Sequence, residues 1–173
     1  MKLQGKKVVV LAENLYQEME VWYPIYRLRE EGANVIVVGT GSAASYTSKH
    51  GYPVKVDKVA SEVDPADIDA VVVPGGYAPD LLRRHESVLK LVKGAFDRGK
   101  VVASICHGPW VLASAGILRG RSATCFFAIK DDVANAGARY EDREVVVDGN
   151  LITSRTPDDL PAFCRAIIAR MLG

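Results

Sequence analysis

Val101-Val-Ala-Ser-Ile-Cys-His-Gly-Pro-Trp110 is the stretch that decides the fold. An apolar, β-leaning run meets a cysteine, a Gly-Pro pair follows at once, and the residues after it continue with helical character. A strand, a sharp turn and a helix with a thiol at the corner form the architecture of a nucleophile elbow. Such a corner places the sulfur of Cys106 next to a helix N-terminus, which favours thiolate over thiol. The alternative is a buried structural cysteine, because free Cys packs as a small hydrophobe.

The composition is that of an ordinary globular chain. Its 173 residues are 49% hydrophobic and 25% charged, which suits one domain with a sizeable core, and we expect a single domain over residues 1–173. The net charge is +1 and the longest basic clusters are pairs, Lys6-Lys7 and Arg83-Arg84. We therefore expect no dedicated nucleic-acid surface and no attraction to anionic membranes.

Cysteine usage and apolar runs bear on location. The three cysteines form no even framework, so a disulfide-stapled secreted domain is not expected and a reducing cytoplasm fits better. The N-terminus enters a predicted strand without the layout of a signal peptide. No apolar run approaches the ~20 residues of a membrane span. The expected location is cytoplasmic.

Buried strands alternate with helical patterns along the chain. Strands rich in Val and Ile are expected over residues 6–11, 34–38, 69–74 and 101–105. Helices are expected over 81–96 and 129–136, beyond Thr156, and before Gly32, where Met19, Tyr23, Tyr26 and Leu28 recur at helical spacing. Short edge strands or a hairpin are expected over 46–56, and a second hairpin around Asp148-Gly149. This order predicts an α/β fold whose mainly parallel sheet is covered on both faces.

The candidate nucleophile is Cys106. In such sheets the site lies beyond the carboxyl ends of the strands, where the elbow, the Gly75-Gly76 turn and the residues after Leu11 are predicted to emerge. A nucleophilic thiol needs a lowered pKa, an approach path and oxyanion donors. The backbone N–H of His107 and those around Gly75-Gly76 are candidate donors, although Pro-Gly-Gly after a strand is also simply a tight turn.

Three acidic residues, Glu13, Glu18 and Glu20, lie just past the first strand. Glu18 and Glu20 are two positions apart and point to different sides of a helix, so at most one should face the sulfur. A carboxyl group beside Cys106 would itself be protonated or would hold the oxidised form of the thiolate. For each of these residues the alternative is a solvated charge at a helix start.

Imidazole is the usual base for a thiol, and His107 follows the nucleophile directly. Neighbouring side chains at a sharp turn diverge, which leaves an ion pair between Cys106 and His107 open. His50 and His85 belong to no visible constellation and are expected on the surface.

Neither a metal site nor a nucleotide site is predicted. No His, Cys, Asp or Glu spacing suggests a dedicated metal site. Residues 39–44 (GTGSAA) fit a Rossmann-type glycine pattern, but no convincing helix follows them, and a nucleotide loop requires one. We therefore expect no cofactor.

Several segments together resemble the PfpI family. They are Glu20, residues 74–80 (PGGYAPD), 103–109 (ASICHGP), 118–121 (LRGR), 129–132 (IKDD) and 145–150 (VVVDGN). The match covers nearly the whole chain, from Lys7 to the last helix. The family comprises intracellular cysteine proteases, later described as deglycases, within the class I glutamine amidotransferase-like superfamily.

The resemblance implies a flavodoxin-like three-layer sandwich and a set of site residues. Cys106 matches the family's nucleophile, Glu20 the carboxyl beside that sulfur, and His107 its histidine. Asp80 matches an acidic residue that, in the protease-like branch, comes from a neighbouring subunit to complete a Cys-His-acid triad, which implies a homodimer or a larger homo-oligomer. Lys49 falls where the family has a lysine near the pocket mouth.

Three positions depart from the family pattern. Gln17 stands where many relatives carry a second acidic residue, and Phe126 stands where protease-like members have a tyrosine. Asp80 is one methylene shorter than the Glu of the archaeal members. Each departure weakens the peptidase hypothesis more than a thiol-centred one.

The function that the resemblance implies first is that of a stress-response enzyme, a glyoxalase without glutathione or a protein deglycase. Methylglyoxal or glyoxal, or their early adducts on protein side chains, would form a hemithioacetal with Cys106, and Glu20 or His107 would move protons. No cofactor is needed. Two alternatives stay open: an intracellular cysteine peptidase, and a redox-sensing or chaperone stress protein whose Cys106 stops at sulfinic acid.

Overall fold

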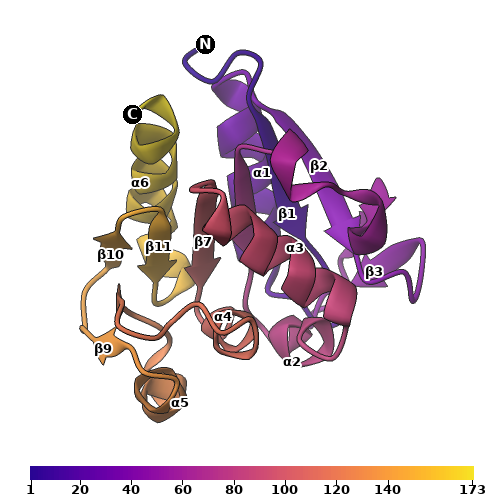
Figure 1. The fold of residues 1–173 in the computed structure, drawn as a ribbon. Helices are drawn as coiled ribbons and strands as arrows, with labels where there is room; N and C mark the ends of the chain where they lie inside the picture. Colours follow the sequence, from indigo (N-terminus) through magenta and orange to yellow (C-terminus); the bar gives the residue numbers. More distant parts are fainter.

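The computed structural model describes residues 1–173 and is built around a seven-stranded sheet (Figure 1). Across the sheet the strands are β10 (Val145–Asp148), β11 (Leu151–Ser154), β7 (Val101–Ile105), β6 (Ala70–Val73), β1 (Lys7–Leu11), β2 (Asn34–Gly39) and β5 (Lys58–Val59). All neighbours are parallel except β10, which pairs antiparallel with β11. The predicted α/β fold with a mainly parallel central sheet is confirmed.

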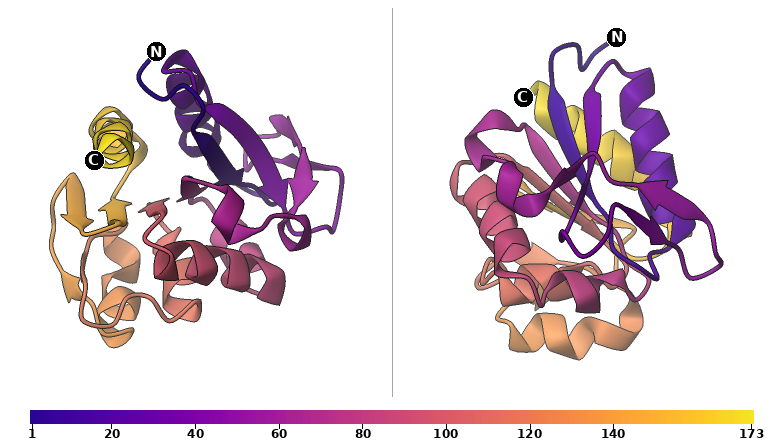
Figure 2. Two further views of the ribbon diagram at one scale, coloured as in Figure 1. Left: turned by 45° about the horizontal axis from the view of Figure 1, so that its top comes forward. Right: turned by 90° about the vertical axis from the view of Figure 1, so that its right-hand side faces the viewer.

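Helices cover both faces of this sheet, as Figure 2 shows. On one face α1 (Glu18–Glu30) packs beside α6 (Leu160–Leu172). On the other lie α3 (Glu86–Asp97) and α4 (Pro109–Ser114), with α2 (Ala78–Leu82) against α4. The result is the expected three-layer sandwich. None of these helices combines the length and the apolarity that a bilayer span requires.

Smaller elements complete the chain. They are the hairpin β3 (Ser45–Thr47) and β4 (Pro53–Lys55), the pair β8 (Ser122–Ala123) and β9 (Arg139–Tyr140), helix α5 (Lys130–Asn135), and the 3-10 turns η1 (Ala60–Glu62), η2 (Pro65–Asp67), η3 (Phe127–Ile129) and η4 (Pro157–Asp159). Both expected hairpins are present, since β3 pairs antiparallel with β4 and β10 with β11.

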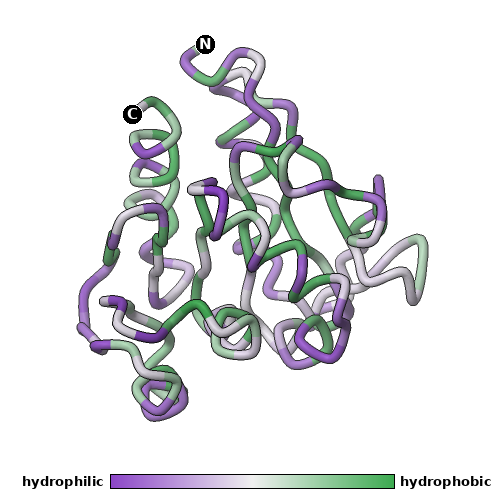
Figure 3. Tube along the Cα trace, in the orientation of Figure 1, coloured by the Kyte–Doolittle hydropathy of each residue, from purple (hydrophilic) through white to green (hydrophobic).

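The central strands are apolar along their whole length because both of their faces are covered. All four residues of β6 and all five of β7 are buried, as are Val8 to Leu11 of β1. Figure 3 shows this as hydrophobic segments in the middle of the trace, with hydrophilic segments concentrated in the outer turns.

The chain changes direction across the sheet at β1. From β1 it runs outward to β2 and β5, then returns to β6 on the opposite side of β1. This is a topological switch point, where open α/β sheets place their sites beyond the carboxyl ends of the strands. The ends of β1, β6 and β7 therefore bring three connecting segments to one edge.

One helix prediction is wrong in its bounds. The pattern over residues 81–96 predicted a single helix, but α2 ends at Leu82 and α3 begins at Glu86. His85 separates them, with an extended backbone (φ −104°, ψ 116°) as the residue that precedes α3. The hydrophobic pattern does not reveal this break, because the polar residues between Leu82 and Glu86 would also fit the outer face of one continuous helix.

Three of the four apolar residues that predicted α1 lie toward its outer face. Met19, Tyr23 and Tyr26 are 52%, 38% and 59% exposed, whereas Leu28 is buried, and the rest of the buried face is made by Glu20, Val21, Pro24 and Ile25. The helix itself is confirmed, but the first residues used to predict it do not face the core.

The glycine-rich loop after β2 leads to β3 and not to a helix. The carboxylate of Glu13, 3% exposed, accepts hydrogen bonds there from the hydroxyls of Thr40 and Ser42, the latter at 2.9 Å. A buried negative charge at this position opposes a phosphate group, and the helix that a nucleotide loop needs is missing.

Candidate active site

The predicted nucleophile elbow is present between β7 and α4. Cys106 has φ +62°, in the left-handed region that costs a non-glycine residue about 1–2 kcal/mol. Two hydrogen bonds hold it there: its N–H donates to Ser154 O at 3.1 Å, and Phe126 N–H donates to its carbonyl at 2.9 Å. A Cβ on Gly108 would lie 2.6 Å from Val73 O, so only glycine fits after the elbow.

The Gly75-Gly76 turn after β6 lies against the sulfur. A Cβ on Gly75 would be 2.5 Å from Glu20 Oε2 and 3.0 Å from Cys106 Sγ. Gly76 has φ +74° and bridges to Tyr16 on the segment after β1. Glycine at position 75 lets the backbone approach the thiol, and glycine at position 76 lets it approach the backbone of Leu15 and Gln17, where a Cβ would lie 2.5 and 2.6 Å away.

The candidate oxyanion donors divide into two kinds. The N–H groups of Gly76 and His107 face the Cys106 sulfur and act to lower its pKa. The Gly75 N–H instead donates to Glu20 Oε2 at 2.7 Å. The prediction that Gly75 offers a donor is therefore corrected, because this N–H is occupied by the carboxyl group that it positions.

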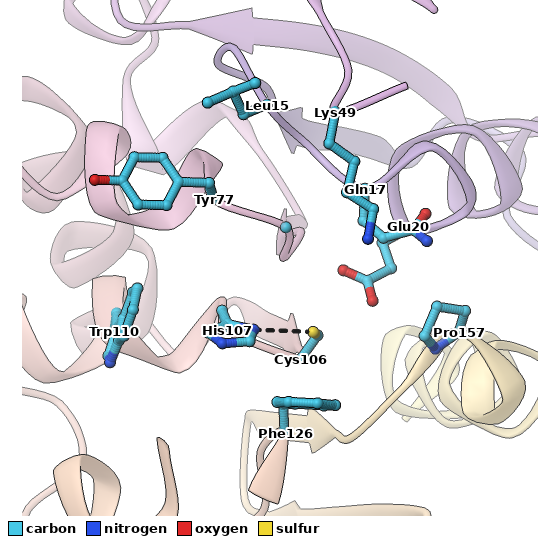
Figure 4. Close-up of a pocket in the computed structure, with 11 residues that line it drawn as sticks. Leu15, Gln17, Glu20, Lys49, Tyr77, Cys106, His107, Trp110, Phe126 and Pro157 are labelled. Carbon is cyan, nitrogen blue, oxygen red and sulfur yellow. Dashed lines mark hydrogen bonds between the residues drawn. The ribbon is translucent and has the colours of Figure 1, made fainter. Parts of the chain in front are cut away.

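Glu20 lies in the first turn of α1 and is fully buried. Figure 4 shows its carboxyl group pointing toward Cys106. Burial raises the pKa of Glu20 to about 7, and the Gly75 N–H, the Cys106 thiol and the positive charge of Lys49 act in the opposite direction. Glu20 Oε1 forms no hydrogen bond in the protein, so no donor stabilises a negative charge on this buried oxygen.

Glu18 points away from this site, as the two-residue separation predicts. Its carboxylate lies 3.0 Å from the Nδ1 atom of His50. His50 is on the surface, as expected, with 70% of its side chain exposed. The expectation that it belongs to no constellation is wrong, since it forms this pair outside the site.

Stability should depend on the Glu20 proton. A carboxyl group whose pKa is higher in the folded than in the unfolded state stabilises the fold fully below the unfolded value, and this contribution is lost as the pH rises. The interval from 4.5 to about 7, at about 1.36 kcal/mol per pKa unit, corresponds to about 3 kcal/mol. We expect the free energy of unfolding of the wild type, relative to Glu20→Gln, to fall by about this amount across that window. Urea unfolding of both proteins at several pH values measures it; a constant difference would contradict the buried neutral carboxyl.

The elbow does not bring the pKa of Cys106 below its ordinary value. Burial first, and then the Glu20 carboxylate, raise the pKa of this thiol to about 12. The N–H groups of Gly76 and His107 act in the opposite direction and are outweighed. This corrects the expected thiolate. Cys106 and Glu20 instead hold two protons below a pH of about 7 and share one above it, so a thiolate forms when that remaining proton moves to Glu20.

The ring of His107 does not diverge from the sulfur, as neighbouring side chains were expected to. Its Nδ1 atom is 3.3 Å from Cys106 Sγ (Figure 4). The ring stacks on Phe126 at 5.0 Å and meets Trp110 edge to face at 5.2 Å. Burial, together with Lys49, lowers the pKa of His107 below 6.5, so at neutral pH the imidazole carries no charge.

These groups open into one cavity of about 590 Å³. It is lined by Leu15, Gln17, Glu20, Lys49, Gly76, Tyr77, Cys106, His107, Trp110, Phe126 and Pro157. Asp80 is not among them: it lies in α2 and forms an ion pair with Arg84. Its action across a subunit interface stays a prediction. No group of three or more His, Cys, Asp or Glu side chains is placed to hold a metal ion.

A family model described as the DJ-1/PfpI family matches residues 6–170. The chain belongs to the DJ-1/PfpI family. "Deglycase TK1284" of Thermococcus kodakarensis is 48% identical over 162 residues, which are 94% of this chain and 97% of that protein. "Putative cysteine protease YraA" of Bacillus subtilis is 42% identical, covering 93% and 95% of the two chains. The crystal structure of Drosophila melanogaster DJ-1beta is similar with a TM-score of 0.90 at 30% identity, over 97% of this chain and 91% of that one.

Membership in the DJ-1/PfpI family confirms the resemblance that the motifs indicated. The structure places five of the predicted residues together in the pocket, namely Glu20, Lys49, Gly76, Cys106 and His107. Gln17 and Phe126, singled out as departures from the family pattern, also line it. The catalytic roles assigned to these residues remain predictions.

The sequence did not point to four other lining residues. Trp110 follows the elbow by one helical turn, which is a usable signal, and Tyr77 follows the Gly-Gly turn. Pro157 begins the η4 turn before α6. Leu15 gave no signal at all, since a leucine with φ +63° cannot be distinguished in sequence from an ordinary one.

Proposed function

We propose that this chain is a cofactor-independent glyoxalase and protein deglycase. Its substrates are methylglyoxal or glyoxal and their early adducts on protein side chains. The observation that carries the proposal is the pairing of the Cys106 thiol with a fully buried Glu20 carboxyl whose pKa is about 7. Such a pair supplies a nucleophile and a proton carrier that titrates near neutral pH. Relatives named deglycase support the same activity.

The first step is addition of sulfur to the aldehyde carbon. The thiol proton passes to the Glu20 carboxylate, the C–S bond forms, and the aldehyde oxygen becomes an oxyanion. The N–H groups of Gly76 and His107, which face the sulfur, are the candidate donors to this oxygen once its carbon is bonded to the sulfur. Return of the proton from Glu20 to that oxygen gives a neutral hemithioacetal.

The second step is an internal oxidation and reduction. Glu20 removes the hydrogen from the former aldehyde carbon as a proton, an enediol forms, and a proton is returned to the neighbouring carbon. The first carbon is oxidised to a thioester and the second is reduced to an alcohol, so no outside oxidant is needed. Water then cleaves the C–S bond. The sum is R–CO–CHO plus H₂O giving R–CHOH–COOH, which for methylglyoxal is lactate.

Early adducts on protein side chains enter the same reaction as a hemiaminal instead of a free aldehyde. In a hemiaminal, the aldehyde carbon is already bonded to a side-chain nitrogen. Sulfur of Cys106 forms its bond to that carbon while the C–N bond breaks, and the amine leaves with a proton. The side chain is restored, and the hemithioacetal proceeds to the hydroxy acid as above.

The test compares wild type with Cys106→Ser on methylglyoxal, following both substrate loss and lactate formation. Lactate formed by the wild type alone supports the proposal. Equal lactate formation by the two proteins overturns it. Following both quantities separates turnover from mere capture of the aldehyde by lysine and arginine side chains.

Peptide hydrolysis is a second candidate, favoured by the 3.3 Å contact between Cys106 and His107 and by the relative named putative cysteine protease. The acid would be Asp80 of a second copy. We expect Asp80→Asn to lower hydrolysis of a fluorogenic peptide by at least ~10-fold, because an orienting carboxylate is lost. Arg84→Ala is the matched control, since it breaks the same ion pair and keeps the carboxylate. Unchanged hydrolysis in Asp80→Asn would remove Asp80 from the site.

A further inference from the structure

We propose that the pocket selects 2-oxoaldehydes with a bulky apolar substituent, an aryl group in preference to methyl, and that Leu15, Tyr77 and Trp110 form the wall that selects it. This inference rests on the proposed function and specifies its substrate class. The shape of the cavity, the strained backbone at Leu15 and the fixed position of Trp110 support it.

The pocket has a reactive side and an apolar side. In Figure 4, Cys106, Glu20 and Lys49 lie on one side of the His107 ring, Tyr77 and Trp110 lie on the other, and Leu15 lies above the ring. A cavity of about 590 Å³ is within the range that binds molecules of drug size. The three carbons of methylglyoxal occupy only the reactive side, so the apolar wall contacts substrate only if the substituent is larger.

Leu15 is held over the pocket at an energetic cost. It and Cys106 are the two non-glycine residues with positive φ, and both line the cavity. Its N–H donates to Thr47 O at 2.8 Å, and its carbonyl accepts from Tyr77 N–H at 2.9 Å. The side chain is 44% exposed, so packing in the core does not compensate for the strained backbone. Strain of this kind clusters at ligand sites, where it positions a contact.

Trp110 is fixed before any substrate arrives. Its indole N–H donates to Asp132 Oδ2 at 2.8 Å, and the Arg83 guanidinium lies 5.8 Å from its ring centroid. The ring also meets His107 edge to face. An aromatic surface with its polar atom already satisfied offers apolar contact without an ordering cost.

The residue beneath His107 is also apolar. Phe126 stands where the resemblance led us to expect a tyrosine, and its ring stacks on His107. Phe126 therefore offers no hydroxyl group to a polar substituent, and the Tyr77 hydroxyl points away from Cys106 in Figure 4. The other polar side-chain atoms of the lining belong to Gln17, Glu20 and Lys49, to the His107 ring between the two sides, and to Trp110, whose N–H is already bonded to Asp132.

The test measures kcat/KM for mandelate formation from phenylglyoxal and for lactate formation from methylglyoxal. We expect the wild type to favour phenylglyoxal by at least ~10-fold, since even one added apolar group in a fitted pocket changes kcat/KM by about that factor. Trp110→Ala should bring the ratio close to one, and Trp110→Phe should retain most of it. Tyr26→Ala, on the outer face of α1, is the control and should leave the ratio unchanged.

Phenylglyoxal also modifies arginine side chains, which can disturb the kinetic comparison. A second measurement therefore uses no dicarbonyl and needs no turnover. The two products are compared as ligands that protect Cys106 from iodoacetamide. We expect mandelate to protect at a concentration at least ~10-fold lower than lactate, and Trp110→Ala to lose this difference.

The outcomes separate the two proposals. Cys106-dependent formation of both products at a ratio of one or below overturns the apolar selection and leaves the proposed function standing. If the wild type prefers phenylglyoxal and Trp110→Ala keeps the same ratio, the selecting role of the wall of Leu15, Tyr77 and Trp110 is overturned. If neither product forms, the proposed function fails. Selective protection by mandelate would then still support the apolar selection, and equal protection would overturn it as well.

Discussion

Cys106→Ser should lower the rate of lactate formation from methylglyoxal by about 10³-fold or more, as expected when a covalent nucleophile is removed. Cys106 is the only thiol that lines the pocket, and both other cysteines are fully buried. Serine keeps the shape and one donor. Its hydroxyl is far less acidic than the thiol, and a Glu20 carboxyl with a pKa of about 7 cannot deprotonate it to a useful extent.

The control for this experiment is Cys164→Ala, which removes a buried thiol from α6, outside the pocket. Both variants should show the circular dichroism spectrum and the assembly size of the wild type. Lactate formation above about a tenth of the wild-type rate in Cys106→Ser would contradict covalent catalysis by this sulfur. It would move the chemistry to a general base acting on a bound hydrate.

The sequence determines the sheet and the elbow because their signals are local and cooperative. β7 is a continuous apolar strand buried on both faces, and such a strand is typical of a parallel sheet. Gly108 and Pro109 follow within three residues of the cysteine, and the structure shows why glycine is needed, since a Cβ on Gly108 would strike the carbonyl of Val73. The strand–turn–helix geometry of the elbow could therefore be predicted from local sequence alone.

The protonation states of Cys106 and Glu20 could not be predicted in the same way. The pKa of a thiol depends on burial and on charges that arrive from distant segments, here Glu20 of α1. The local signal, a helix N-terminus, pointed to a lowered pKa and was outweighed. The occupied N–H of Gly75 is likewise a contact between residues 55 positions apart. Asp80 poses the same problem on a larger scale, since its predicted partner lies in a second copy of the chain.

Glu20→Gln should reduce kcat/KM for lactate formation by about 10²-fold to 10⁴-fold, the usual contribution of a general acid–base. The amide keeps the size of the side chain, and its oxygen can accept from the Gly75 N–H that now bonds Oε2. It cannot receive the thiol proton or remove the hydrogen from carbon. In the wild type kcat/KM should rise through about pH 7, because the Cys106 and Glu20 pair must lose one of its two protons first.

The rate of Cys106 alkylation by iodoacetamide, measured against pH, identifies the group responsible. We expect the wild-type profile to show a step near pH 7 and Glu20→Gln to lack it, with reaction rising only above the ordinary thiol pKa of 9.0, because burial still raises the pKa of Cys106. Glu30→Gln, at the exposed end of the same helix, is the control and should keep the step. If Glu20→Gln retains a step, and that step lies below pH 6.5, the proton carrier is His107, whose pKa burial and Lys49 lower into that range. The assignment of proton transfer to Glu20 would then be wrong, while the role of the sulfur would stand.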